Sequence, residues 1–466
     1  MRKNRRTDEK LSLRLGTLFP TQGVAQSLTR SFTTRFSQRD FDPLDLSPVL
    51  AFDTKTSMLA TGGADAANLD LVATLDNRVS GGVDATQTTS SYQPRAHVPL
   101  GDGHLHLPGV SGNYASLAAG VALGTQTEIL IGVKVRTWSP SDSQALFDQY
   151  PASLMVWLRS TGKIQLYFGT SANIQTASGI PASAPLETVI KIVRDGTDAS
   201  TEVFYKDHDG SFVSLGSATL GAVGAAPTGS SQELSLGRWR SGNQKYADCS
   251  YQTLKVTADS TVTLDLDMSD GAHKASSFTC ASGQTVTISK SGLDPATIIR
   301  RNVLRFDGAN SYVGGTFGSD LNTAHAFIKF AVNGDVFSTT GPSTMSVYRT
   351  HHWLTNAANF FLGSGTTSVN ARTYIGATVL QQNGKWNDDN GTIVSEVSIS
   401  DGAHFSKVNN ANLLTDSRAY SLNANKFRIG AGSTGGHAPM DVEQIYLFDR
   451  VLSDTESAKM YNYVSK

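Results

Sequence analysis

One loop combines an aromatic ring with basic and amide side chains. In GRWRSGNQKY, residues 237–246, Trp239 stands between Arg238 and Arg240, and Asn243 follows in the same polar run. Sites for polar small molecules such as sugars combine an aromatic surface with a few hydrogen-bonding groups. The loop therefore predicts a carbohydrate-binding site formed by these four side chains. The alternative is a polar loop with one packed tryptophan.

A second loop offers oxygen ligands for a metal ion. NDDNG, residues 387–391, places Asp388, Asp389 and Asn390 side by side. Carboxylate and amide oxygens are the ligands that calcium prefers. The alternative is an ordinary turn, which Asp and Asn favour in any case. Calcium is the one cofactor that the sequence suggests, and we expect no other.

Patterns typical of catalytic sites are absent from the sequence. Glycosidases need two carboxylates about 5–10 Å apart, but the chain contains neither a Glu-x-Asp-x-x-Glu strand nor a Gly-x-Ser-x-Gly elbow. Asp265, Asp267 and Asp270 form a solvated strand face more simply than a catalytic one. His104 and His106 share a strand face, but no third zinc ligand lies near them in the sequence. We therefore expect no enzymatic activity.

The composition and periodicity indicate an all-β protein. Only 17% of the 466 residues are charged, and 43 are glycine, which suits many strands joined by tight turns. Apolar and polar residues alternate in EILIGVKVRTW (128–138) and in TVIKIVRDG (188–196). Alternation of this kind, bounded by glycine and aspartate, is typical of half-buried strands.

The sequence also repeats itself. Segment 233–256 can be aligned with segment 426–448, so that Gly237 and Gly430 each end a strand and an aspartate follows eleven residues later in both. Two copies of one fold are the simplest explanation of such a repeat. We therefore expect a first sandwich in residues 46–297 and a second in residues 298–466.

The first 45 residues differ from the rest of the chain in charge. Residues 1–39 carry a net charge of +7, with Arg2, Lys3, Arg5 and Arg6 in one cluster, whereas the remainder is near −8. The alternatives are a solvated tail and an anchoring arm that binds an acidic partner. The acidic remainder argues against nucleic-acid binding. Neither a secretion signal nor a membrane span is expected.

Two motifs at the ends of the second copy carry a family resemblance. RFDGANSYV (305–313) and IYLFDRVLSDTESAKMYNYV (445–464) resemble the opening and closing elements of laminin G-like proteins, which have a concanavalin A-like jelly-roll fold. The resemblance implies two such β-sandwich jelly rolls in tandem after an extended N-terminal arm. It also implies that calcium can bind at the rim of a sandwich.

The final segment predicts a short C-terminal helix. Ser453 followed by Glu456 forms the sequence pattern of a capping box. Ala458, Tyr461 and Val464 would then share an apolar face. We expect this face to cover one mouth of the second sandwich.

The whole layout is similar to that of virion proteins of tailed bacteriophages, especially in segments 41–53 and 77–95. The resemblance implies a non-enzymatic structural protein located in the virion, as a tail fibre, appendage or capsid decoration. Its arm would bind other virion proteins, it would form a homo-oligomer, and it would adhere to a cell-surface glycan. The alternatives are a secreted or surface lectin module and a polysaccharide hydrolase. Cys249 and Cys280 are expected to be reduced and buried.

Overall fold

A computed structural model describes most of the chain, and the statements below concern only the residues that it describes. The chain divides into two units, Met1–Leu46 and Ser47–Lys466. The first unit is described only from Phe41 onward, where Pro43–Leu46 form a short 3₁₀ helix. The described residues are 41–149, 154–168, 172–195, 200–219, 233–239, 244–292, 294–333, 343–348, 357–365, 368–375, 378–383, 392–417, 422, 424–432, 435–437 and 439–466.

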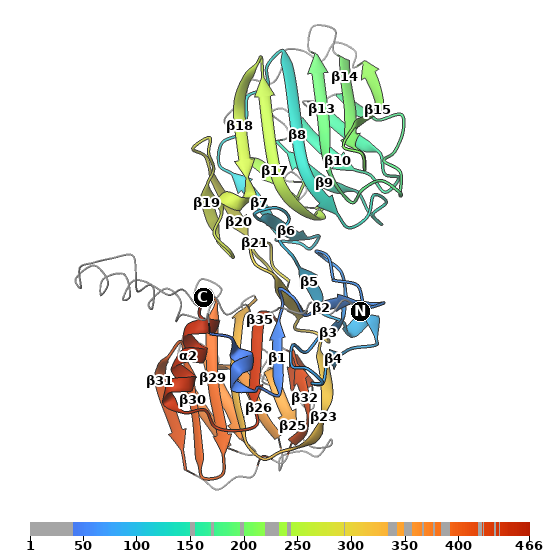
Figure 1. Ribbon diagram of the computed structural model, residues 1–466. Helices are drawn as coiled ribbons and strands as arrows, with labels where there is room; N and C mark the ends of the chain where they lie inside the picture. The colour runs from blue at the N-terminus through green and yellow to red at the C-terminus, as the bar shows by residue number, and fades with distance from the viewer. Residues whose placement is uncertain are drawn as a thin grey trace, which may run out of the picture. The chain divides into compact units, whose positions relative to one another are not determined.

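Residues 104–299 form one β-sandwich, here called sandwich I (Figure 1). Its strands are β6 (His104–Pro108), β7 (Tyr114–Leu117), β8 (Gln126–Val135), β9 (Gln144–Asp148), β10 (Leu154–Leu158), β11 (Ile164–Phe168), β12 (Ala172–Gln175), β13 (Glu187–Asp195), β14 (Ser200–Lys206), β15 (Phe212–Thr219), β16 (Leu234–Leu236), β17 (Asp248–Ala258), β18 (Thr261–Asp267), β19 (Ser277–Thr279), β20 (Thr285–Ser289) and β21 (Thr297–Ile299).

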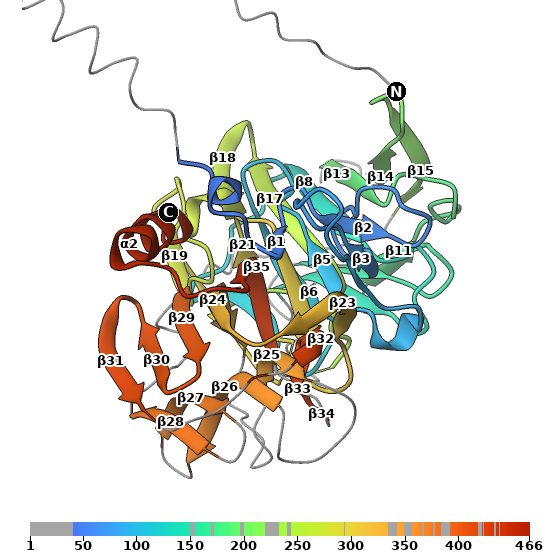
Figure 2. The ribbon, with the colours of Figure 1, turned by 60° about the horizontal axis from the view of Figure 1, so that its bottom comes forward.

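The other sandwich, here called sandwich II, combines strands from both sides of sandwich I in the sequence (Figure 2). Its strands are β1 (Leu50–Asp53), β2 (Met58–Ala60), β3 (Val72–Leu75), β4 (Ala85–Thr86), β5 (Arg95–His97), β22 (Val303–Asp307), β23 (Val313–Leu321), β24 (Ala324–Val332), β25 (Ser343–Tyr348), β26 (Ala357–Gly365), β27 (Ser368–Ile375), β28 (Thr378–Asn383), β29 (Ile393–Ser400), β30 (Ala403–Val408), β31 (Ala411–Asp416), β32 (Ala424–Ile429), β33 (Ala431–Gly432), β34 (Gly435–His437) and β35 (Pro439–Phe448).

The two sandwiches share one strand order. In sandwich I the sheets run β15-β14-β13-β8-β17-β6-β21 and β12-β11-β10-β9-β16-β7-β20-β19. In sandwich II the matching sheets run β31-β30-β29-β24-β35-β22-β5 and β28-β27-β26-β25-β32-β23-β4-β3-β2. Both β17 and β35 bulge at the corresponding point, at Gln252 and Glu443. The predicted all-β class and the pair of jelly rolls are therefore confirmed.

The division between the sandwiches differs from the predicted one. β1 pairs with β35 and β5 pairs with β22, so Leu50 and Phe52 lie in the core of sandwich II. The corresponding places in sandwich I are already filled, because β18 pairs with β17 and β21 pairs with β6. The predicted boundaries of 46–297 and 298–466 are therefore wrong. Sandwich I is an insertion between two parts of sandwich II.

The glycines that mark the sequence repeat meet the same steric constraint in both copies. Gly237 follows β16 with φ at 84°, and Gly430 follows β32 with φ at 88°. A Cβ at Gly237 would overlap the side chain of Leu107, and one at Gly430 would overlap the ring of Phe306. Leu107 in β6 and Phe306 in β22 occupy equivalent strands. Each glycine therefore lets the chain turn directly over a core side chain.

The C-terminal helix α2 (Asp454–Val464) begins with the predicted capping box. The Ser453 side chain accepts a hydrogen bond from the Glu456 backbone, and the Glu456 carboxylate accepts one from the Ser453 backbone. Hydrogen bonds from the Arg450 side chain and then from Ser453 lower the pKa of Glu456 to about 2. This cap fixes the start of the helix.

The buried face of α2 is not the predicted one. Ser457, Met460 and Val464 are buried, whereas Ala458 is exposed and Tyr461 is only partly buried. Ser457 donates a hydrogen bond to Glu396 of β29, and the ring of Tyr463 contacts that of Tyr446 in β35. The helix thus packs on the outer face of a sheet of sandwich II and not over a sandwich mouth. There Ser457 supplies the hydrogen-bond donor that the buried carboxylate of Glu396 needs.

Two further expectations concern the membrane and the cysteines. Across the described ranges, no helix combines the length and the apolar character needed to cross a membrane. Cys249 and Cys280 are both buried and free, as predicted.

The constraint on Gly430 can be tested by substitution. Gly430→Ala should lower the free energy of unfolding by the roughly 1–2 kcal/mol of a left-handed backbone and by about 1–3 kcal/mol more for the overlap with Phe306. Gly283→Ala is the matched control, because its φ is 80° but nothing lies within 4 Å of the added Cβ. Urea unfolding of both variants measures the difference. Equal losses would contradict the close approach to Phe306.

Candidate functional site

The outer face of one sheet of sandwich I is covered by aromatic side chains. Along β10, Leu154, Val156 and Leu158 point into the core, so Met155 and Trp157 point to the opposite face. Trp157 is nevertheless only 7% exposed. A tryptophan can be this well buried on an outer face only where other side chains cover it.

Tyr167 and Trp239 provide that cover. The ring centroid of Trp157 lies 5.4 Å from that of Tyr167 in β11 and 5.6 Å from that of Trp239, which follows β16. The guanidinium of Arg159 lies 5.9 Å from the Trp157 ring. The three rings meet at tilted or edge-to-face angles of 57° and 70°, which are favourable for aromatic pairs.

Trp239 is positioned by a short bridge in the backbone. Its N–H donates to the carbonyl of Gln244 at 2.8 Å, and the Gln244 N–H donates back at 3.3 Å. Trp239 is half-buried rather than free in the loop. Whether it contacts a sugar stays a prediction. Arg240 and Asn243, which were predicted to act with it, lie outside the described residues.

Arg238 is held on the same face by an ion pair. Its guanidinium donates to Glu233 at 2.8 Å and to Ser235 at 3.1 Å. It also lies 3.4 Å from the ring centroid of Tyr114 in β7, a cation–π contact. The ion pair fixes the guanidinium of Arg238 over Tyr114. Arg238 therefore connects the rings near β16 with the Tyr114 ring in β7.

We call Tyr114, Trp157, Tyr167 and Trp239 the aromatic strip. It crosses the sheet in the order β11-β10-β9-β16-β7. Neighbouring strands lie about 4.8 Å apart, so these five strands span about 19 Å. Tyr114, Tyr167 and Trp239 are each partly exposed. A strip of this length offers contact to several rings of a linear ligand.

Polar groups flank the strip. Gln165 donates from its amide to the hydroxyl of Tyr167 at 2.8 Å. Near the Trp239 bridge, Lys245 pairs with Asp142 at 2.6 Å, and that hydrogen bond lowers the pKa of the carboxyl. The buried indole N–H groups of Trp157 and Trp239 have no acceptor within the described part of the chain. The face therefore combines apolar rings with donors and acceptors, as a site for a polar, ring-shaped ligand requires.

The other predicted site residues cannot be placed. The calcium ligands Asp388, Asp389 and Asn390 lie outside the described residues, as does the arm with Arg2, Lys3, Arg5 and Arg6. Calcium binding and arm-mediated anchoring stay predictions.

Sequence reasoning missed Tyr114, Trp157 and Tyr167. Each lies in a short apolar run that fits a core strand, and alternation shows only that Met155 and Trp157 share a face. It does not show which face points outward. The signal that could have found them is the adjacent aromatic pair Tyr167 and Phe168 in the sequence, because neighbouring residues of a strand alternate between faces and one such ring is then expected on the outside.

Comparison with known proteins supplies no family. Neither a protein-family model nor a curated protein sequence matches the chain. Among solved structures, domains LG4-5 of the mouse laminin alpha1 chain are similar, with 13% identity and a TM-score of 0.28, over 74% of this chain and 87% of that one. The LG1-3 region of the laminin alpha2 chain gives 10% identity and a TM-score of 0.29, over 76% and 63%.

A third similar structure is a putative carbohydrate-binding protein from Bacteroides ovatus, with 11% identity and a TM-score of 0.30, over 44% of this chain and 61% of that one. Scores at this level carry no argument about function. The jelly-roll fold rests on the strand order and the two cores of the chain itself.

The cover over Trp157 predicts a measurable effect of Trp239. Trp239→Ala should expose the Trp157 ring and lower the free energy of unfolding by about 2 kcal/mol, less than the roughly 3–5 kcal/mol for a fully buried tryptophan. In fluorotryptophan-labelled protein, the Trp157 resonance should gain a solvent-isotope shift. Tyr167→Phe, which removes only a hydroxyl, is the control. An unchanged Trp157 resonance in Trp239→Ala would contradict the packing described above.

Proposed function

We propose that this chain is a non-enzymatic saccharide-binding protein whose aromatic strip holds a linear oligosaccharide. The observation that carries the proposal is the row of three half-exposed rings, Tyr167 in β11, Trp239 after β16 and Tyr114 in β7, with polar side chains beside it. The C–H face of a pyranose is apolar and packs on such rings, while its hydroxyls need donors and acceptors at the rim.

The residues divide this work between them. Tyr167 and Trp239 present half-exposed rings for stacking, and at the far end Arg238 lies over the ring of Tyr114 and offers donors beside it. Arg159 and Gln165 lie beside the Trp157–Tyr167 end and supply donors for hydroxyl groups. Trp157 is too deeply buried to stack on a sugar and instead supports the other rings.

The proposed setting is the surface of a virion, where the protein would be a homo-oligomeric tail fibre, appendage or capsid decoration. Support for this setting comes from the sequence alone: the N-terminal arm is basic, and the layout resembles that of virion proteins of tailed bacteriophages. The cell-surface glycan bound by the strip would then be a receptor on the host. If the protein is instead a lectin on another surface, it would use the same strip and would not need the N-terminal arm for anchoring.

The saccharide site can be tested directly. A glycan array should identify an oligosaccharide ligand, and calorimetry should then show that Tyr167→Ala weakens its binding about tenfold, since one lost ring contact amounts to about 1.4 kcal/mol. Tyr92→Ala is the matched control, because Tyr92 is a 40% exposed tyrosine in the segment that belongs to sandwich II. Equal affinity of both variants would refute the strip as the site. Release of reducing ends from the bound oligosaccharide would refute the non-enzymatic part.

The proposed anchoring by the N-terminal arm can be tested separately. Deleting residues 1–40 should abolish incorporation into particles, because the net charge of +7 in residues 1–39 is removed. The truncated chain should still bind the oligosaccharide, since the strip lies wholly within sandwich I. Copurification with particles measures the first effect and calorimetry the second. Normal incorporation of the truncated chain would contradict the anchoring role.

A further inference from the structure

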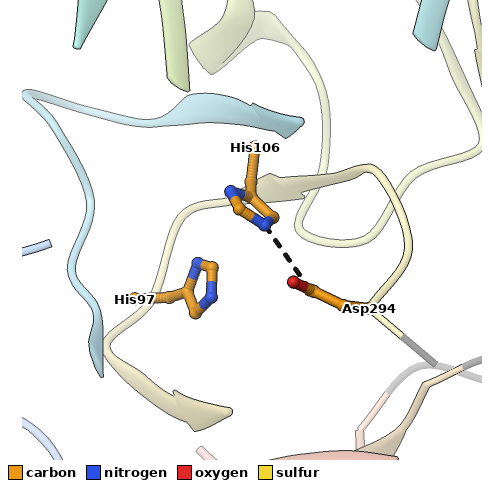
Figure 3. Close-up of side chains that lie close together, drawn as sticks. All are labelled: His97, His106 and Asp294. Atoms are coloured by element: carbon orange, nitrogen blue, oxygen red, sulfur yellow. Dashed lines mark ion pairs between the residues drawn. The ribbon is translucent and has the colours of Figure 1, made fainter. Parts of the chain in front are cut away.

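Three potential metal ligands meet where the chain passes between the two sandwiches. His97 lies in β5 of sandwich II, His106 lies in β6 of sandwich I, and Asp294 precedes β21 (Figure 3). Each offers one ligand atom, and the three atoms all lie within 4.8 Å of one another. These three side chains take no part in the aromatic strip, which lies on other strands.

Their geometry is close to that of a four-coordinate site. Zinc bonds of about 2.0–2.1 Å in a tetrahedral arrangement place neighbouring ligand atoms about 3.3 Å apart. Nε2 of His106 lies 3.5 Å from an Asp294 carboxylate oxygen. The ring centroids of His97 and His106 are 4.4 Å apart at 78°. Small side-chain rotations would bring all three ligand atoms to one ion.

Burial makes the two histidines unusual. His97 is 0% exposed and His106 is 2% exposed. Neither ring nitrogen of His97 nor of His106 has a hydrogen-bond partner in the described part of the chain. Buried polar atoms without partners cost about 1–3 kcal/mol each and are rare in folded proteins. A bound ion would give one nitrogen of each ring a partner.

His104 provides the contrast within the same strand. Its Nδ1 accepts a hydrogen bond from the backbone of Leu100 at 3.2 Å, and its Nε2 lies 3.4 Å from the amide of Asn68. His104 therefore has a hydrogen-bond partner on at least one ring nitrogen, whereas His106, two residues later, has none in hydrogen-bond geometry within the described residues.

Charged side chains of both signs surround the three ligands. Arg305 donates to Asp294 at 2.7 Å and, through two nitrogens, to Asp441 at 2.8 and 2.9 Å. Lys274 lies 3.2 Å from Asp441. The first contact orients the Asp294 carboxylate, as partners of metal ligands do. A divalent ion added to this group would bring further positive charge, which an anion as a further ligand would offset.

A pocket beside Asp294 has room for that anion. The pocket has a volume of about 340 Å³ and is lined by Asp294, Arg305, Arg95 and Ser90, among others. Asp294 is 31% exposed, whereas both histidines are buried. The open coordination position of the ion would therefore lie on the Asp294 side and face the pocket. The basic groups of Arg95 and Arg305 lie near it.

We propose that His97, His106 and Asp294 bind one zinc-type divalent ion, whose fourth position is open to this pocket and takes water or a small anion. Two imidazoles and one carboxylate are ligands that zinc accepts in sites with an exchangeable position. Because the ligands come from both sandwiches, the ion would also tie β5 to β6 across the crossover.

The equivalent position in the other repeat is used differently. In the strand register, His106 lies opposite Thr297 on one side and Ser250 on the other. Arg305 lies at the corresponding place in sandwich II, opposite Arg95 and Asp441. One repeat thus places a buried arginine–aspartate ion pair where the other places a buried histidine 3.5 Å from Asp294. The metal ligand is specific to sandwich I and is not a feature of the shared fold.

The test uses the full chain after dialysis against a chelator. Zinc titration by calorimetry, with metal analysis, should give one ion per chain. His106→Gln and Asp294→Asn should each weaken binding at least tenfold. His208→Gln, which changes an exposed histidine of sandwich I, is the matched control and should bind as the unchanged chain does. Absence of zinc binding, or equal binding by all variants, would overturn the proposal.

A second measurement does not depend on the folding of the variants. Cobalt(II) added to the unchanged chain should give the intense visible absorption bands of a four-coordinate site, and zinc should displace them. Anomalous scattering from zinc-soaked crystals should place the ion between His97 and His106. An ion found only at surface residues, or octahedral cobalt bands alone, would refute the site.

Discussion

The structure depends on strands that reach sandwich II from the other side of sandwich I in the sequence. β1 pairs with β35 and β5 pairs with β22, whereas the equivalent strands of sandwich I, β18 and β21, come from sandwich I itself. Without β1, the core of sandwich II would lose Leu50 and Phe52. The chain must therefore pass twice between the sandwiches.

Both passages meet at a group of buried charges. Arg305 and Lys274 come from different sandwiches and both contact Asp441, while Asn333 accepts a hydrogen bond from Lys274 and donates one to Asp441. Buried ion pairs often add little net stability but penalise every arrangement that leaves one charge unpaired. The group thereby specifies how the two sandwiches meet. The cluster of His97, His106 and Asp294 lies in the same region and joins it through Arg305.

Local features were predictable from the sequence, whereas long-range ones were not. Alternation in EILIGVKVRTW gave the strand and its core residues Ile129, Ile131 and Val133, because the pleat has a period of two. The capping box of Ser453 and Glu456 is likewise local. The pairing of β1 and β5 with sandwich II was not predictable, because a strand finds a distant partner by shape and register that one sequence does not contain. The assignment of residues 46–97 to the first sandwich was wrong for this reason.

The candidate sites follow the same division. Trp239 was recognisable from its polar loop, but its contact with Trp157 depends on the outer face of a sheet. His106 was visible on a strand face, but His97 and Asp294 come close to it only because β5 and β21 cross between the sandwiches. Function in this fold thus depends on which strands are neighbours in space. The saccharide strip uses neighbours within one sandwich, whereas the metal cluster uses neighbours from both.

The addition of β1 to sandwich II is tested most directly by a cross-link between β1 and β35. Ala51 faces Tyr446 across these antiparallel strands, and partners of this kind have Cβ atoms about 4.5–5.5 Å apart. The double variant Ala51→Cys with Tyr446→Cys should form a disulfide on mild oxidation, so that peptide mapping recovers the two segments joined. If the two thiols stay free under these conditions in the folded chain, β1 does not pair with β35, and the insertion of sandwich I into sandwich II is contradicted.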